Sequence, residues 1–352
     1  MVKNNENKLR IKYIGNKIRN KYQGVGKIIY PSGKISIGTF IENKLQNNGK
    51  IIYPDGRICI GNFNDNKLEG YGKIIFTTDI IADICFGTGN FVNNNLEGPG
   101  EINYSDGVKK IGIFLNNILA GPGEIIFPSG QRRVGSFVKN ILQGNGYIIN
   151  IDGIKKIGNF IDNELQGIGK VEFPDNIIYS GIFVDNVLQG EGEIIFPNSY
   201  KKIGIFVDSN LQGKGQIVLP SGQTRIGNFI DNNLQGPGEI IFPNGQKHIG
   251  NFIDNVLNGP GQSIFPNNII YNGTFVNGKL QGDGSIVQSN GIKLIGQFTC
   301  NILQGKGTII FPCGKIYIGT FIDNKMQGQC EIICTDNTKY IATLFNSEIN
   351  EI

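Results

Sequence analysis

The chain has 352 residues, of which 51 are glycine, 39% are hydrophobic and none is tryptophan. Its formal net charge of +4 is small for this length and argues against a nucleic-acid-binding protein, which would carry a concentrated basic face. Many glycines and few bulky core residues favour a thin sheet with a large surface. The excess of isoleucine, asparagine and lysine is typical of an AT-rich genome, such as that of a giant virus or a protist.

Residues 1–10 are polar, and we expect them to form a mobile tail. Their charges are not followed by an apolar segment, so they do not have the form of a secretory signal. No part of the sequence approaches the roughly 20 consecutive apolar residues of a membrane-spanning helix. We therefore expect an intracellular, cytoplasmic protein, with peripheral attachment to a membrane as an open alternative.

A 23-residue unit then repeats from residue 11 to residue 345. Each unit begins with a glycine that precedes x-Phe, which we call the anchor. Successive anchors lie 23 residues apart, except for Gly61 and Gly89, which are 28 apart. In the clearest copy the recurring positions are Gly227, Phe229, Asn232, Leu234, Gly236, Gly238, Ile240 and Phe242. Missing such a repeat would lead to the wrong fold class.

The repeat predicts β-hairpins. Each unit holds two short runs of β-branched and aromatic residues, separated by Asp-Asn at one end and by Pro-Asn-Gly or Pro-Ser-Gly at the other. We predict an all-β fold, an elongated single twisted antiparallel sheet (solenoid-like) of about 14 repeated 23-residue β-hairpins.

The period of two places Leu234, Gly236, Gly238, Ile240 and Phe242 on one face, as part of a ladder of Phe, Leu and Ile. A glycine that recurs inside a strand indicates that another group approaches the backbone closely. We expect that group to be an aromatic ring from a neighbouring strand.

Three places depart from the pattern. The first copy has Lys17 where phenylalanine stands elsewhere, which suits the cap of a repeat array. Residues 77–88 form an irregular loop with five extra residues, either a tolerated insertion or a docking loop. The last copy has Met326, Cys330 and Ala342 at positions of the pattern, either as a cap or as an interface, and residues 346–352 form a C-terminal tail.

The pattern G-x-F-x-x-N-x-L-x-G-x-G-x-x-x-[FY]-P-x-G resembles the MORN repeat (membrane occupation and recognition nexus). The resemblance covers roughly residues 11–345. It implies a repeat scaffold for protein association, and the family name suggests peripheral membrane binding. The family usually has tyrosine two residues before the anchor, and here tyrosine stands there only at Tyr13, Tyr179, Tyr271, Tyr317 and Tyr340.

Basic residues fill this place in the middle of the array. The candidate row for an anionic ligand is Lys110, Arg133, Lys156, Lys202, Arg225 and His248, and each member follows Lys109, Arg132, Lys155, Lys201, Thr224 or Lys247. Stacked hairpins would align these residues into one stripe that binds anionic lipid head groups or an acidic protein surface. Alternatively, they are solvated charges that discourage edge aggregation and pair with Glu101, Glu124, Glu193 and Glu239.

A second row is apolar. Isoleucine precedes many anchors, as at Ile226, Ile249 and Ile318, and alternation points these residues away from the Phe/Leu ladder. Apolar rows on both faces are unusual for a monomer. Either composition places isoleucine on a tolerated surface, or a partner or a second copy covers that face.

Identical groups at identical spacing do not form a catalytic constellation, which needs different groups held together. The chain has one histidine, and its Gly-x-Gly pairs lack the Gly-Lys-Ser/Thr ending of a phosphate loop. We predict no enzyme activity, no catalytic residue, no cofactor and no metal site. The predicted function is a non-catalytic scaffold or adaptor for protein–protein interaction and self-association, and the alternative is binding to anionic phospholipid through the basic row. The predicted partners are an unidentified protein, a second copy or an anionic membrane surface, and not nucleic acid.

Overall fold

The computed structural model of the protein describes residues 10–76 and 84–347. These residues form 29 β-strands and one short 3-10 helix, and neighbouring strands pair antiparallel. The predicted fold class, an all-β antiparallel sheet of repeated hairpins, is confirmed. The chain divides into two compact units, Met1–Pro174 with Val184–Asn186 and Asp175–Phe183 with Val187–Ile352.

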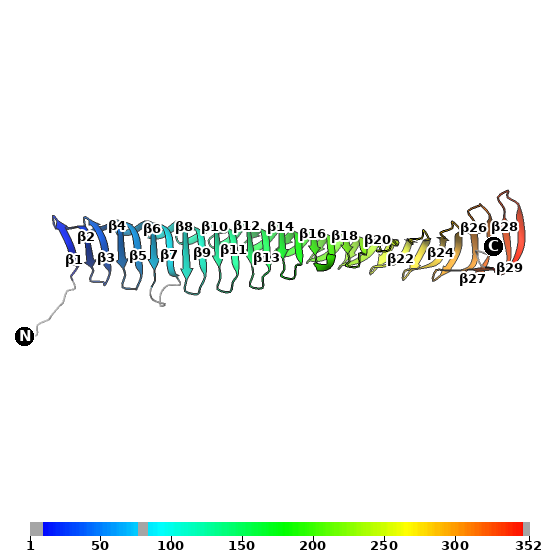
Figure 1. The fold of residues 1–352 in the computed structure, drawn as a ribbon, viewed down its shortest axis with the longest axis horizontal. Helices are drawn as coiled ribbons and strands as arrows, with labels where there is room; N and C mark the ends of the chain where they lie inside the picture. Colours follow the sequence, from blue (N-terminus) through cyan, green and yellow to red (C-terminus); the bar gives the residue numbers. More distant parts are fainter. Residues whose placement is uncertain (1–9, 77–83, 348–352) are drawn as a thin grey trace, which may run out of the picture. The chain divides into compact units, whose positions relative to one another are not determined.

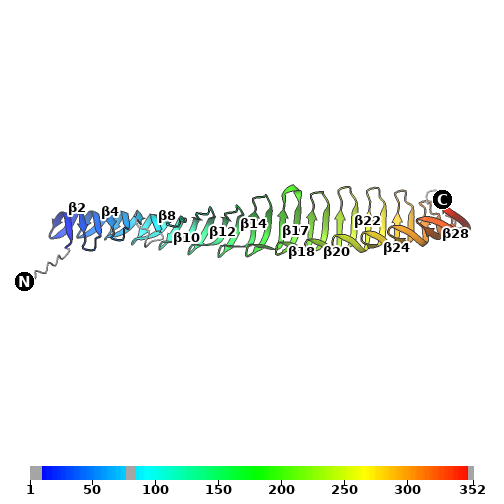
Figure 2. The same cartoon turned by 90° about the horizontal axis from the view of Figure 1, so that it is seen from below.

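In the first unit each strand lies beside the next in sequence order (Figures 1 and 2). Its strands are β1 (Lys12–Ile18), β2 (Lys21–Ile29), β3 (Ile35–Ile41), β4 (Lys44–Ile52), β5 (Ile58–Asn64), β6 (Lys67–Ile75), β7 (Ile84–Val92), β8 (Asn95–Tyr104), β9 (Lys109–Leu115), β10 (Ile118–Ile126), β11 (Arg132–Val138), β12 (Ile141–Ile149), β13 (Lys155–Ile161) and β14 (Glu164–Glu172). Residues 84–88 of the predicted loop lie in strand β7. Residues 77–83 of that loop, and residues 1–9 of the predicted tail, lie outside the described residues.

The second unit is built in the same way. Its elements are β15 (Ile178–Val184), β16 (Val187–Ile195), η1 (Pro197–Ser199), β17 (Lys201–Val207), β18 (Asn210–Val218), β19 (Thr224–Ile230), β20 (Asn233–Ile241), β21 (Lys247–Ile253), β22 (Val256–Ile264), β23 (Ile270–Val276), β24 (Lys279–Val287), β25 (Lys293–Thr299), β26 (Ile302–Ile310), β27 (Ile316–Ile322), β28 (Lys325–Ile333) and β29 (Lys339–Ser347). Residues 348–352 lie outside the described residues.

Turn chemistry sets the ends of each hairpin. Asp231 and Asn232 have φ of 46° and 67°, and such paired positive values define the tight turn that matches the twist of two antiparallel strands. At the other end Gly245 has φ of 86°. Asn176 and Asn268 replace this glycine with φ of 65° and 63°, as expected of a residue that tolerates the left-handed region.

A bulge interrupts the second strand of each hairpin. Gly227 lies opposite Gly238, but the next pair of β19 and β20 skips Gly236 and Pro237. These two residues pair with the following strand instead, with Gly236 opposite Phe252. The sequence predicts simple alternation here, whereas the bulge bends the strand and holds Gly236 at φ of 68°.

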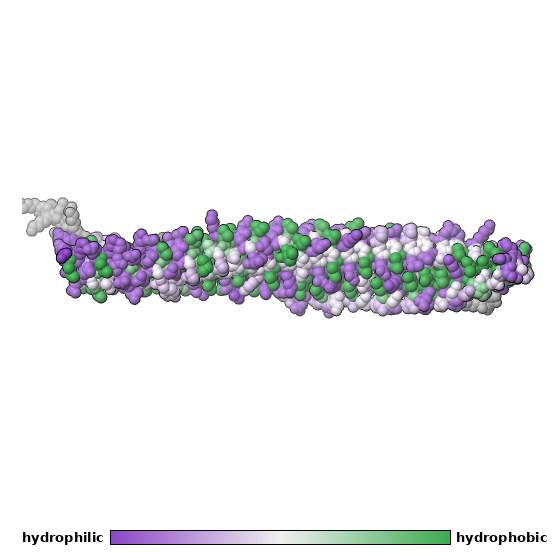
Figure 3. Space-filling view, turned by 90° about the horizontal axis from the view of Figure 1, so that it is seen from above, coloured by the Kyte–Doolittle hydropathy of each residue, from purple (hydrophilic) through white to green (hydrophobic). Residues whose placement is uncertain are grey.

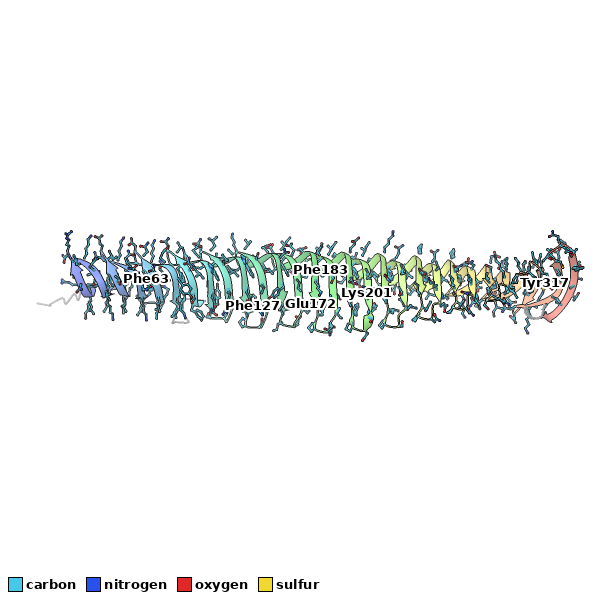
Figure 4. The ribbon with its side chains drawn as sticks, turned by 45° about the horizontal axis from the view of Figure 1, so that its top comes forward. Phe63, Phe127, Glu172, Phe183, Lys201 and Tyr317 are labelled. Atoms are coloured by element: carbon cyan, nitrogen blue, oxygen red, sulfur yellow. The ribbon has the colours of Figure 1, made fainter. Side chains whose placement is uncertain are left out.

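The ladder of Phe, Leu and Ile forms the core. Phe229, Leu234 and Ile240 are 1%, 0% and 3% exposed, and the same positions are buried in most other copies. We call their side of the sheet the ladder face and the other side the opposite face. Figure 4 labels Phe63 and Phe183, the ladder phenylalanines of one hairpin in each unit.

The recurring glycines make room for backbone, not for the predicted aromatic ring. A Cβ on Gly227 would lie 2.8 Å from the carbonyl oxygen of Pro237, 2.8 Å from Leu234 Cδ1 and 2.9 Å from the Cα of Gly238. The prediction of a ring is therefore wrong for this and most other copies. A ring comes close in some end copies, as Phe321 does at Gly307.

The turn asparagine links each hairpin to the one before it. The backbone N–H of Asn324 donates to the carbonyl of Leu303 at 3.2 Å, and the side-chain oxygen accepts from the N–H of Leu303 at 2.7 Å. The side chain thus gives the N–H of Leu303 a partner, which the backbone of the turn does not provide. The asparagines that accept in this way are Asn43, Asn66, Asn94, Asn117, Asn140, Asn163, Asn186, Asn232, Asn255, Asn301 and Asn324.

Asn324→Gly keeps the left-handed turn and removes the side-chain acceptor. We expect it to lower the free energy of unfolding by about 1 kcal/mol, because the N–H of Leu303 loses its partner. Urea unfolding followed by far-UV circular dichroism measures the change. Hydrogen exchange at Leu303 should accelerate together with it.

The chain contains natural counterparts of this variant. Ser209 and Gly278 stand at the asparagine position and make only the backbone bond. Ser209→Asn should therefore stabilise the protein by about 1 kcal/mol, and Ser209→Gly should not. Equal effects of these two substitutions would show that turn conformation, and not the hydrogen bond, determines stability here.

Two glycines of one hairpin should differ in their tolerance. Gly227→Ala places a methyl group against backbone at φ of 151°, so we expect a loss of about 3 kcal/mol or more. Gly236→Asn should stay within about 1 kcal/mol of the wild type, because a Cβ there meets nothing within 4 Å. Asn47 already occupies the equivalent position with φ of 61°. Similar losses in urea unfolding for both variants would contradict this account.

Candidate binding surfaces

Three of the six candidate basic residues form one row in the first unit. Lys110, Arg133 and Lys156 lie on β9, β11 and β13, two residues before each anchor. Ile125 lies opposite both Lys110 and Arg133, and Ile148 lies opposite both Arg133 and Lys156. The basic residues therefore alternate with ladder isoleucines in a line across the strands, on the ladder face.

The other three form the same arrangement in the second unit. Ile217 lies opposite both Lys202 and Arg225, and Ile240 lies opposite both Arg225 and His248. The structure thus brings the predicted row together as two sets of three, one in each unit. We call each set a ladder-face basic row.

The basic residues one position earlier lie on the opposite face. The expectation that both members of each pair form one stripe is wrong, because successive residues of a strand point to opposite sides. The expectation of glutamate partners is confirmed for these outer residues alone. Their ion pairs are Lys109 with Glu101 at 2.9 Å, Arg132 with Glu124 at 2.5 Å, Lys201 with Glu193, and Lys247 with Glu239 at 3.6 Å.

Aromatic rings and asparagines hold three of the ladder-face cations, Lys110, Arg133 and Lys202. The Lys110 ammonium lies 4.5 Å from the ring centre of Tyr104 and donates to its hydroxyl at 3.0 Å. It also donates to Asn140 Oδ1 at 3.1 Å, the same atom that accepts from the N–H of Leu119. A cation over an aromatic face is attracted by the ring quadrupole.

The contact recurs at Arg133. Its guanidinium carbon lies 4.9 Å from the ring centre of Phe127, which Figure 4 labels, and its Nη1 donates to Asn163 Oδ1 at 3.0 Å. Lys202 in the second unit lies 5.6 Å from the ring centre of Phe196 and donates to the turn asparagine of the next hairpin at 2.9 Å. In each case the side-chain oxygen of one asparagine accepts hydrogen bonds from the backbone of the preceding hairpin and from the cation.

These contacts explain why a cation can replace the tyrosine of this position. Tyr271 and Tyr317 pack against the rings of Phe265 and Phe311 at 5.1 and 5.3 Å between centres. The ring centre of His248 lies 5.0 Å from the ring centre of Phe242. The cation–π contact thus substitutes for a ring–ring contact in the same place.

Burial lowers the pKa of Arg133, Lys156, Lys202, Arg225 and His248, because loss of water disfavours the charged form. Within residues 10–76 and 84–347, no ladder-face basic row member takes part in an ion pair. The two faces therefore differ in charge balance, with paired cations on one and unpaired cations on the other.

A hollow of about 390 Å³ opens between two members of the first row. Its lining residues are Tyr104, Asp106, Val108, Lys110, Ile125, Phe127, Arg133 and Asn140. The carboxylate of Asp106 accepts from the backbone N–H of Val108 at 2.9 Å, so this acid serves the local turn. The hollow combines an apolar wall with two cations and one carboxylate, so its lining has a net positive charge that suits an anionic group on an apolar frame.

Aliphatic side chains line the opposite face. Ile226, Ile249 and Ile318 are 38%, 39% and 40% exposed, which confirms that they point away from the ladder. Three residues after the anchor the exposure is greater, as at Leu115 with 59% and Val138 with 57%. Figure 3 shows hydrophobic residues recurring among hydrophilic ones along both units.

In the part of the chain that the structure describes, no group of three or more His, Cys, Asp or Glu residues is placed to hold a metal ion. No helix of these residues has the length and apolar character to cross a membrane.

Sequence reasoning missed the double role of the turn asparagines. Each one accepts from a residue 21 positions earlier, or 26 for Asn94, and three also accept from a cation 30 positions earlier. The signal was present as an asparagine that recurs five residues after the anchor. Its partners could not be assigned without the register of neighbouring hairpins.

The single histidine should make stability depend on pH in a narrow window. Its folded pKa lies below the ordinary value of 6.5, so the folded protein binds fewer protons than the unfolded chain below that pH. The contribution of His248 to stability should be constant above about pH 7 and fall as the pH drops below 6.5. His248→Tyr should reduce this loss, measured as the difference in Tm between pH 7.5 and 5.5. Equal pH dependence of both proteins would contradict the assignment.

Three solved structures are similar to parts of the chain. The TCP10 domain of Danio rerio CPAP is 12% identical, covers 64% of this chain and 99% of its own, and has a TM-score of 0.25. The Drosophila melanogaster SAS-4 TCP domain in complex with a proline-rich motif of Ana2 is 14% identical, with 56% and 89% covered and a TM-score of 0.23. Virginiamycin B lyase from Staphylococcus aureus is 12% identical, with 95% and 100% covered and a TM-score of 0.12. These scores are too low to support an argument.

No curated protein matches the sequence. The MORN repeat, in contrast, matches more than half of it, at residues 13–35, 37–56, 59–79, 88–109, 111–132, 157–177, 179–199, 226–247, 248–269, 271–293, 295–314 and 317–339. Residues 133–156 and 200–225 lie outside these matches, yet they contribute to hairpins with the same register. The chain therefore belongs to the MORN-repeat family.

Proposed function

We propose that this MORN-repeat chain is a non-catalytic scaffold that binds proteins along its sheet and associates with a second copy of itself. The observation that carries the proposal is the exposed aliphatic row on the opposite face. Leu115, Val138 and Ile161 hold the same place in three successive hairpins and are 59%, 57% and 52% exposed. Contiguous exposed apolar groups favour association, because burying them removes apolar surface from water.

The arrangement of polar groups supports the same proposal. Each hairpin presents nearly the same side chains as the one before it, so the sheet offers a repeated surface and no single constellation of different groups. Repeat arrays use such extended surfaces for binding. The repeated side chains of the hairpins are therefore sufficient for the surface of a scaffold.

Self-association can be tested on the opposite face of the first unit. The wild type should sediment as dimers or larger species at micromolar concentration in analytical ultracentrifugation. The triple variant Leu115→Thr, Val138→Thr and Ile161→Thr should shift toward the monomer, because it loses exposed apolar area while keeping residues suited to strands.

A matched control keeps the row apolar. Leu115→Ile, Val138→Ile and Ile161→Val change shape but not polarity, and they should leave the sedimentation profile unchanged. A wild type that stays monomeric up to about 100 μM, a concentration at which a contact of about 5.5 kcal/mol would be half-populated, would contradict self-association.

Binding to anionic phospholipid through the ladder-face basic rows is the second candidate. It draws on their unpaired positive charge, since juxtamembrane cations are attracted to anionic lipids. The half-burial of these cations and their bonds to asparagine favour it less, because a flat bilayer would have to reach recessed groups. Flotation of a variant without the ladder-face cations with anionic vesicles distinguishes lipid binding from protein binding.

A further inference from the structure

The ladder-face basic row of the first unit has a regular pitch. Its three cations lie on alternate strands of a continuous set of pairings, β9 to β13. Adjacent strands are about 4.8 Å apart, so successive cations recur every ~9.6 Å across the sheet. A ligand that meets all three must carry its recognised groups at the same interval.

Only one regular peptide conformation has that interval at a whole turn. A polyproline II helix has three residues per turn and rises about 3.1 Å per residue, which places every third side chain ~9.3 Å apart on one side. A β-strand repeats a face every ~6.7 Å, and an α-helix repeats a turn every ~5.4 Å. The row therefore matches a polyproline II segment with one recognised residue per turn.

The positive charge of the row determines which residue the ligand carries at each turn. Lys110, Arg133 and Lys156 form no ion pair within the described ranges. From beyond ion-pair distance, Glu164 acts on Arg133 and Lys156, and Asp152 acts on Lys156. Lys110 and Arg133 are held in place by Asn140 and Asn163, so little further ordering is needed when an anion binds. Carboxylates are the complementary groups of a protein partner.

The walls of the row suit the residues between the carboxylates. The hollow between Lys110 and Arg133 is lined by the rings of Tyr104 and Phe127, which recur at the interval of one hairpin. Aromatic-lined grooves recognise the preformed polyproline II helix through its proline rings. The hollow of about 390 Å³ has room for such a turn.

We propose that the row Lys110, Arg133 and Lys156 binds an acidic protein segment in the polyproline II conformation, with a carboxylate at every third residue. The proposal rests on the proposed function as a protein-binding scaffold and names the chemistry of one partner. It concerns the ladder face, whereas self-association concerns the opposite face.

The test uses the full chain and fluorescein-labelled peptides in fluorescence anisotropy. The probe peptide repeats Glu-Pro-Pro, which places its carboxylates every third residue. One comparison peptide alternates Glu and Pro, with the same number of glutamates, and another repeats Gln-Pro-Pro. The probe should bind at least tenfold more tightly than either, and its binding should weaken as salt is raised.

Two variants on the same three strands provide a matched comparison. Lys110→Gln, Arg133→Gln and Lys156→Gln remove three charges from the ladder face. Lys109→Gln, Arg132→Gln and Lys155→Gln remove three charges from the opposite face. We expect at least a tenfold loss of probe affinity for the first variant and less than about a twofold change for the second.

A third variant guards against loss of folding. The substitutions are Lys110→Tyr, Arg133→Tyr and Lys156→Tyr. Tyrosine already occupies the equivalent position in other hairpins, as Tyr271 and Tyr317, so the hairpins should keep their fold. Circular dichroism checks the fold, and the probe should again bind at least tenfold more weakly. Retained binding in this folded variant would overturn the proposal.

Three further outcomes would also overturn it. Equal losses in the two glutamine variants would show a general charge effect. Equal affinity for the alternating peptide would show that the spacing of the carboxylates does not matter. Flotation with vesicles containing phosphatidylserine, abolished in the ladder-face variant and without peptide binding, would assign the row to a membrane. Sedimentation of the same variants separates the proposals, because lost peptide binding with intact self-association leaves the scaffold function standing.

Discussion

Close approach of two backbones inside each hairpin is the constraint on which the rest depends. Gly227 and Gly238 face each other so closely that a Cβ on Gly227 would lie 2.9 Å from the Cα of Gly238. The anchor takes φ of 151°, a value open to glycine and strained for other residues. The bulge that follows bends the strand, and Leu234 fills the space over both glycines. Burial of the ladder in a single sheet follows from this local packing.

Asparagine side chains make the hairpins cooperate. A hairpin alone is marginally stable, so a repeat array depends on the contacts between neighbours. Each turn asparagine completes a two-bond bridge to the preceding hairpin, as Asn163 does with Leu142. Because Asn163 also accepts from Arg133, the bond that joins the hairpins also positions a surface cation. Array stability and ligand-facing geometry are therefore coupled at the same oxygen.

Periodicity predicted the faces well, because alternation along a strand is a local property. The burial of Phe229 and Leu234, and the outward direction of Ile226, could all be read from spacing. The bulge at Gly236 could not, since a skipped pair depends on register between strands. The register between strands also determines what lies beside each glycine, and for this reason the prediction of an aromatic ring was wrong. Alternation could also have separated each pair of basic residues, yet the recurrence of basic residues before six anchors in the middle of the array suggested one stripe.

Separation of the charges by face changes what they can do. Arg132 forms an ion pair with Glu124 across the strands, whereas Arg133 lies over the ring of Phe127 and has no carboxylate in ion-pair contact. The ring contact keeps the packing that tyrosine provides elsewhere in the array, so replacement by a cation alters charge with little change in the core. A repeat protein can therefore acquire a charged binding row one hairpin at a time. The pitch of that row is then set by strand spacing, and only a ligand with a matching repeat can neutralise all of it.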